Sequence, residues 1–144
     1  MRLRMARRVG LAVLIASFAM AGVATSGNPN TSFSAPRAIE FDATAFGSAT
    51  GAQVVFSNTS TEAVAAPVLE SVGTNGNVDA FFVQRNVEGP DTCEARPVVQ
   101  PGSYCVAWLR FEPPPSNNNR MYTGSACFQS SGDALCVRLQ ARSL

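Results

Sequence analysis

The chain has 144 residues, with 11 Lys or Arg and 10 Asp or Glu, which gives a formal net charge of +1. It contains no histidine, and all of its basic residues are arginine. Most catalytic triads, Schiff-base enzymes and imidazole-ligated metal centres are therefore excluded. We expect no catalytic residues, no metal site and no cofactor.

The first 21 residues have the pattern of a secretory signal peptide. Four arginines precede an uncharged apolar run over residues 9–21, which ends in the small-x-small sequence Ala19-Met20-Ala21. We expect cleavage after Ala21 or Ala24, and hence a periplasmic or extracellular protein. The run is shorter than the about 20 residues of a membrane-spanning helix, so we expect membrane contact only if this segment stays uncleaved.

Removal of the signal peptide changes the sign of the charge. The four arginines before residue 9 are lost, which leaves seven arginines against ten acidic residues, a net charge near −3. A mildly acidic chain without a basic run is a poor ligand for nucleic acid or an anionic membrane. We expect a protein or another envelope macromolecule as the partner, and the sequence leaves the oligomeric state open.

The remaining chain is expected to form a short arm and one β domain. Residues 22–36 are rich in Gly, Asn, Ser and Pro, which predicts a mobile N-terminal arm. Residues 37–144 contain short Val-, Phe-, Leu- and Thr-rich runs between turn residues, which predict seven strands. They are Ala38–Asp42, Ala52–Asn58, Pro67–Val72, Ala80–Arg85, Ser103–Phe111, Gly124–Ser130 and Ala134–Ala141. The pattern predicts an all-β, immunoglobulin-like antiparallel β-sandwich of about seven strands.

Alternation along the strands assigns side chains to faces. In residues 104–111 the apolar set, which should face the core, is Cys105, Ala107, Leu109 and Phe111. The opposite face then carries Val106 and Trp108, and the same reasoning in two other strands turns Val55 and Phe82 outward. A contiguous apolar patch on a surface marks an interface. The predicted interface residues are Trp108, Val106, Phe82 and Val55.

The four cysteines are predicted to form disulfides. Zinc sites and thioredoxin-type redox sites use closely spaced pairs such as C-x-x-C, which this chain lacks. A cysteine nucleophile would need a histidine base, which is also absent. An even number of cysteines in an exported chain is typical of a disulfide framework.

The last hairpin predicts how the cysteines pair. Ser131-Gly132 suits a two-residue turn, and counting outward from it places Cys127 directly opposite Cys136. This is a non-hydrogen-bonded pair, where Cα atoms lie about 4.5 Å apart, within the range of a disulfide. Cys127–Cys136 follows, which leaves Cys93–Cys105. Each bond closes a short loop and is worth about 3 kcal/mol in the chain-entropy model.

Several short motifs follow one another along residues 38–142. They are Phe46-Gly47, Asn58-Thr59, Asp79 with Phe81, and then Cys93, Pro101-Gly102, Cys105, and Phe111 with Pro113. In this order they resemble the ASH-type (abnormal-spindle/Hydin) immunoglobulin-like domain, in its bacterial "choice-of-anchor" form. The resemblance implies a binding or scaffolding module, not an enzyme, and it implies a bond between the cysteines that flank the Pro-Gly turn. Cys127 and Cys136 depart from the pattern.

Three functions follow, in order of preference. The first is an exported, non-catalytic binding or scaffolding module that acts through a sheet face or edge. The second is a structural subunit of a surface fibre, in which the N-terminal arm adds a strand to a neighbouring copy. The third is a secreted enzyme with a carboxylate-based site, for which Glu40 and Asp42 are the candidates because they share one face of a predicted strand.

Overall fold

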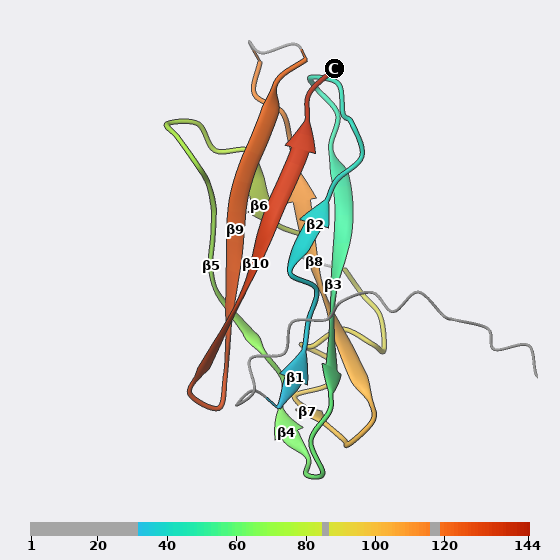
Figure 1. The fold of residues 1–144 in the computed structure, drawn as a ribbon. Coiled ribbons are helices and arrows are strands. Elements are labelled where there is room, and N and C mark those ends of the chain that lie inside the picture. Colours follow the sequence, from blue (N-terminus) through green and yellow to red (C-terminus); the bar gives the residue numbers. More distant parts are fainter. Residues whose placement is uncertain (1–31, 85–86, 116–118) are drawn as a thin grey trace, which may run out of the picture.

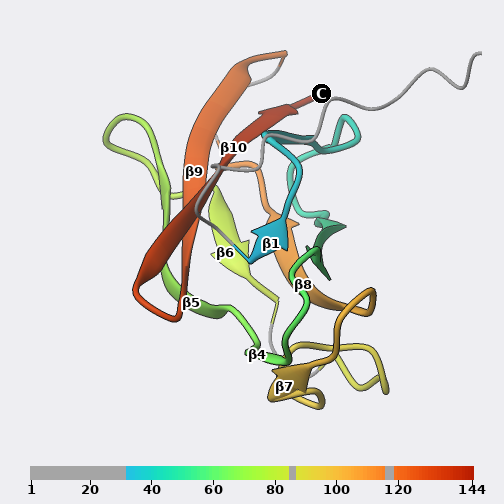
Figure 2. The ribbon, with the colours of Figure 1, turned by 60° about the horizontal axis from the view of Figure 1, so that its bottom comes forward.

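The protein is a β-sandwich. The computed structural model describes residues 32–84, 87–115 and 119–144, and these contain strands but no helix (Figure 1). Sheet I has the strand order β1-β3-β8-β6, sheet II has the order β2-β10-β9-β5, and β4 and β7 form a small two-stranded sheet. The two large sheets form separate layers, with β4 and β7 at the end of the sandwich away from the C-terminus (Figure 2).

The predicted all-β sandwich is confirmed, and all seven predicted strands are present with shifted ends. The strands are β1 (Phe33–Ser34), β2 (Ala38–Glu40), β3 (Thr50–Asn58), β4 (Val64–Ala65), β5 (Val68–Thr74), β6 (Phe81–Val83), β7 (Val98–Val99), β8 (Tyr104–Phe111), β9 (Met121–Ser130) and β10 (Asp133–Arg142). The two-residue strands β1, β4 and β7 are not among the predicted strands. The predicted sandwich is antiparallel throughout, whereas β2 runs parallel to β10.

The N-terminal arm is shorter than predicted. Phe33, which was assigned to the mobile arm, is 1% exposed and lies in β1, which pairs with the end of β3. Ala35 is buried as well. Burial of the phenyl ring of Phe33 stabilises the fold, and this free energy exceeds the cost of ordering the neighbouring Ser and Pro residues. The β domain therefore begins by residue 33, and the predicted signal peptide lies outside the described residues.

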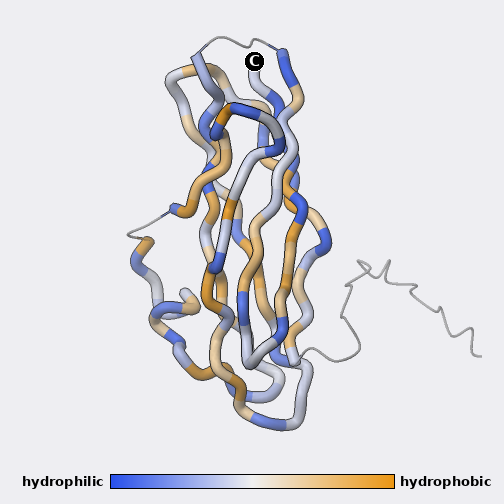
Figure 3. Tube along the Cα trace, turned by 90° about the vertical axis from the view of Figure 1, so that its left-hand side faces the viewer, coloured by the Kyte–Doolittle hydropathy of each residue, from blue (hydrophilic) through white to orange (hydrophobic). Residues whose placement is uncertain are grey.

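Aromatic rings fill the space between the sheets. Buried and more exposed residues alternate along β3, β9 and β10, so each sheet turns one face inward. Figure 3 shows the hydropathy of the residues along the chain. Ring centroids lie 4.7 to 6.1 Å apart in the contacts Phe56–Phe128, Phe41–Phe81, Phe81–Phe111, Phe111–Tyr122 and Phe41–Phe111. Such separations are favourable for aromatic pairs. Because these rings come from both sheets, they hold the two layers together.

The β9–β10 hairpin has the register that its turn predicts. Ser131 and Gly132 both have positive φ, 49° and 90°, as a type I′ turn requires. Asp133 pairs with Ser130 and Cys136 pairs with Cys127. The inward residues of the hairpin are those that alternation selects, including Phe128 and Val137, each 1% exposed.

The side chain of Asn58 fixes the end of β3. Asn58 is 1% exposed, and its amide nitrogen donates hydrogen bonds to the carbonyl oxygens of Glu62 and Val99. Its side-chain oxygen accepts bonds from the backbone and the hydroxyl of Ser60. A buried amide with all of these bonds avoids the cost of desolvation. This explains why an asparagine stands at this motif position.

We predict that Leu109→Ala lowers the free energy of unfolding by about 2–5 kcal/mol, the usual cost of a large-to-small change in a core. Leu109 is fully buried. The control is Arg110→Ala, because Arg110 is 43% exposed and forms a surface ion pair with Glu112. It should cost less than about 1 kcal/mol. Urea unfolding measures both changes, and equal losses would contradict the assignment of faces.

A glycine pair offers a second test of the packing between β5, β6 and β9. A Cβ at Gly124 would lie 2.7 Å from Cδ2 of Phe81 and would clash with the carbonyl oxygen of Gly73, whereas a Cβ at Gly73 has open space. Gly124→Ala should therefore destabilise the protein by about 1–3 kcal/mol through overpacking. Gly73→Ala should not lower the stability, because alanine reduces the conformational entropy of the unfolded chain. Thermal unfolding of both variants tests this asymmetry.

Candidate interaction surface

The four predicted interface residues lie on one face of sheet I. Val55 of β3 pairs with Val106 of β8, and Phe82 of β6 pairs with Arg110 of β8. Trp108 lies between Val106 and Arg110 on the same strand. Paired residues and residues two apart in a strand share a face, so these side chains belong to the face of sheet I turned away from the core. We call this the outer face.

These residues differ in how far they are exposed. Val55 is 38% exposed, and Phe82 and Trp108 are half-buried. Val106 is only 7% exposed, so the prediction that it is available to a partner is wrong. Val106 still lies outside the core cluster between the sheets.

A returning segment explains the burial of Val106. The backbone nitrogen of Val106 donates to the carbonyl oxygen of Asp91 at 2.8 Å, and the backbone nitrogen of Cys93 donates to the carbonyl oxygen of Val106 at 2.9 Å. Thr92 thereby forms a parallel bridge with Val106, opposite the side occupied by Val55. Sequence alternation could not reveal this, because residues 91–93 were not predicted to pair with β8.

The Cys93–Cys105 disulfide holds this segment in place. The two Cα atoms lie 4.8 Å apart, and Cys105 is fully buried. After the disulfide, Arg96 forms an ion pair with Asp91 and its guanidinium lies 5.6 Å from the ring centre of Tyr104. These contacts fix a compact loop against one end of β8.

The Pro101-Gly102 turn that follows has the geometry that its sequence favours, since Gly102 has φ of 73° and the backbone nitrogen of Ser103 donates to the carbonyl oxygen of Gln100.

The second cysteine pair lies on sheet II. Cys127 and Cys136 face each other across the hairpin with Cα atoms 4.1 Å apart, as the turn register predicted. Cys136 is exposed, because it belongs to the polar face of β10. Both cysteine pairs thus lie at disulfide distance, which is typical of proteins in an oxidising environment.

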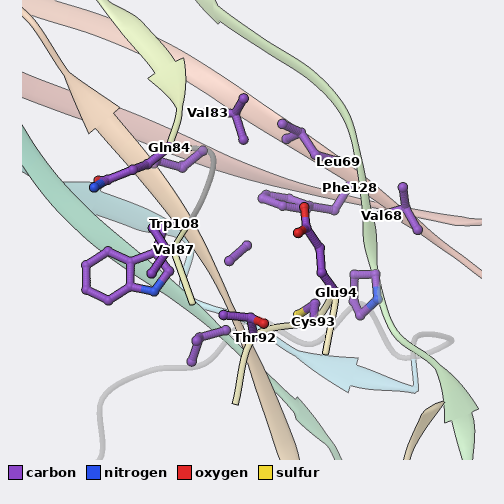
Figure 4. A pocket seen from close by; sticks show the side chains of 14 residues that line it. Val68, Leu69, Val83, Gln84, Val87, Thr92, Cys93, Glu94, Trp108 and Phe128 are labelled. Carbon is purple, nitrogen blue, oxygen red and sulfur yellow. The ribbon is translucent and has the colours of Figure 1, made fainter. Parts of the chain in front are cut away.

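The structure also contains a cavity that the sequence analysis missed. It measures about 440 Å³ and lies at the edge of the sandwich between β5 and β8 (Figure 4). Leu69 and Phe128 of sheet II line one side and Trp108 of sheet I lines another, while Glu94 projects into the space between them (Figure 4). No local motif marks it, because its walls come from segments that are far apart in the sequence.

Glu40 and Asp42, the carboxylate pair considered for an enzymatic site, do not lie together in one strand. Strand β2 ends at Glu40, and the intervening Phe41 is buried while Glu40 and Asp42 are exposed. Within residues 32–84, 87–115 and 119–144, no three His, Cys, Asp or Glu side chains are grouped as metal ligands. In the same residues no helix is present that could cross a membrane.

Comparisons with known proteins define the fold. No family model and no curated protein matches the sequence. The structure is similar to the ASH/PapD-like domain 7 of human CEP192, with a TM-score of 0.52 and 16% identity over 89% of this chain and 96% of that domain. It is also similar to part of a family 123 glycoside hydrolase from Clostridium perfringens, with a TM-score of 0.53 and 12% identity over 76% of this chain and 23% of the hydrolase. The chain therefore has the ASH-type, PapD-like immunoglobulin fold that its motifs indicate.

We expect non-reducing peptide mapping of the protein to recover only Cys93–Cys105 and Cys127–Cys136 linked peptides. Only these partners are close enough in the fold, with Cα separations of 4.8 and 4.1 Å. Removal of either bond by paired Cys→Ser changes should lower stability by about 3 kcal/mol. A peptide that links Cys93 to Cys136 would contradict the assignment.

Proposed function

We propose that the protein is an exported, non-catalytic binding module of the choice-of-anchor type, which binds an envelope protein through the outer face of sheet I. One observation carries the proposal: Val55, Phe82 and Trp108 form a partly exposed apolar group on this face. Burial of this apolar group by a partner removes it from water, which makes the association favourable.

The surroundings of this group suit an interface. Gln53 is exposed and lies opposite Trp108, and the Arg110–Glu112 ion pair lies at the other side of the tryptophan. An apolar centre with a polar rim is the common arrangement of protein–protein interfaces, where aromatic residues carry much of the binding energy. Val106 lies on the same face but is covered by residues 91–93, so it is not counted among the contacting residues.

Export is supported by two separate observations. The first 21 residues have the composition of a signal peptide. The cysteines are paired within the fold, and such pairs persist in the periplasm or outside the cell. The same two observations support a binding partner in the cell envelope.

The two alternative functions have less support. Phe33 and Ser34 already pair with β3 of their own chain, so this part of the arm is not available as a strand for a neighbouring copy. A fibre would have to use residues before 32, which lie outside the described part of the chain. Glu40 and Asp42 lie in open solvent without the enclosed setting in which a carboxylate acts as an acid or base.

We predict that Val55→Asp weakens the association at least about tenfold, because it places a charge in an apolar interface without changing the core. The tagged protein is used to isolate its partner from an envelope extract, and the affinity of the purified pair is then measured by interferometry. The control is Val98→Asp, because Val98 is 52% exposed but lies in β7, outside sheet I. Equal affinities of the two variants would exclude the outer face.

A further inference from the structure

The cavity between β5 and β8 has walls of mixed chemistry. Strand β6 ends at Val83, so this part of β8 faces β5 across an opening at the edge of the sandwich. The walls toward sheet II are aliphatic and aromatic, with Leu69 half-buried and Phe128 1% exposed. On the opposite wall lies the half-buried indole of Trp108 (Figure 4).

Among the described residues that line the cavity, one carries a charge, Glu94. Glu94 follows Cys93 directly, so the disulfide to Cys105 positions its backbone at the mouth of the cavity. Its side chain points into the cavity in Figure 4. Among the described residues Glu94 has neither a salt-bridge partner nor a side-chain hydrogen bond, whereas the neighbouring Asp91 is paired with Arg96. This carboxylate therefore contributes a negative charge to the described walls of the cavity.

These walls select for an amphipathic cation. An anionic ligand would be repelled by Glu94, and a purely apolar ligand would take water away from the carboxylate without replacing its hydrogen bonds. A lysine or arginine side chain has an apolar stem that can pack on Leu69 and Phe128 and a charge that can reach the carboxylate. The indole of Trp108 adds a favourable cation–π contact.

We propose that the cavity receives a lysine or arginine side chain of the protein partner. The proposal rests on the proposed function and names a second contact of the same complex, at the sheet edge beside the outer face, with Trp108 shared by the two contacts. A volume of about 440 Å³ is within the range of pockets that hold ligands. It accommodates a long side chain together with the partner's adjacent backbone.

The shape of β5 favours recognition through a side chain over addition of a whole strand. The pairing of β5 with β9 is irregular between Leu69 and Ser71, which leaves Glu70 as an extra residue in the edge strand. A bulge at an edge interrupts the row of free backbone groups that another strand would need. Glu70 also adds a second acidic residue next to the cavity-lining Leu69.

The test uses two peptides that differ only in charge. The probes are acetyl-Val-Arg-Val-amide and the same peptide with citrulline, which has nearly the shape of arginine but no charge. The chain has a single tryptophan, so its indole N–H gives one cross-peak in a ¹H–¹⁵N spectrum that needs no assignment. We expect the arginine peptide to shift this peak in a saturable way below about 10 mM, with at least about fivefold weaker binding of the citrulline peptide.

Matched variants identify the carboxylate. Glu94→Gln should reduce the preference for arginine over citrulline to the smaller part that the indole of Trp108 supplies, because the carboxylate no longer pairs with the guanidinium. Glu40→Gln removes the same charge from an exposed residue of β2, at the opposite edge of sheet II, and should keep the preference. Thermal unfolding of both variants should match that of the unchanged protein, since both side chains are exposed.

Three outcomes would overturn the proposal: no saturable shift of the indole peak, equal binding of both peptides, or an unchanged preference in Glu94→Gln. None of these outcomes would contradict the proposed function, because the Val55→Asp experiment measures the association without using Glu94. If that experiment fails while the peptides bind as expected, the cavity stands as a site and the outer-face interface is wrong.

Discussion

The Cys93–Cys105 disulfide is the constraint on which the arrangement around β8 depends. It ties a segment without a regular strand of its own to a fully buried position of sheet I. The backbone of Asp91 and Cys93 then pairs with Val106, which covers that valine. The bond lowers the conformational entropy of the unfolded chain, which stabilises the folded state by about 3 kcal/mol. The side chains that follow Cys93 are consequently held beside β8 without support from a continuous ladder.

Those features that depend on local patterns could be predicted from the sequence. The inward set of β8 and the register of the β9–β10 hairpin follow from strand alternation and from the two-residue turn at Ser131-Gly132. Both rules act over a few residues and need no knowledge of the distant chain. The pairing of Cys127 with Cys136 follows from the same turn.

Other features could not be predicted because they depend on packing between segments far apart in the sequence. Val106 is on the predicted face, but residues 91–93 return to cover it. Phe33 lies among turn-forming residues, and only the space at the end of β3 shows why it is ordered. The cavity is formed by β5, β8, β9 and the segment around Glu94, so no single stretch of sequence contains its pattern.

The placement of the two disulfides has a mechanical consequence. In antibody domains the conserved bond joins the two sheets, whereas here neither bond joins them, and the bonds span only 12 and 9 residues of sequence. The first and last paired strands, β1 and β10, belong to different sheets. A pulling force applied to the ends would therefore be resisted only by noncovalent contacts. Once these yielded, nearly the whole contour length would extend, apart from the two short cross-linked loops.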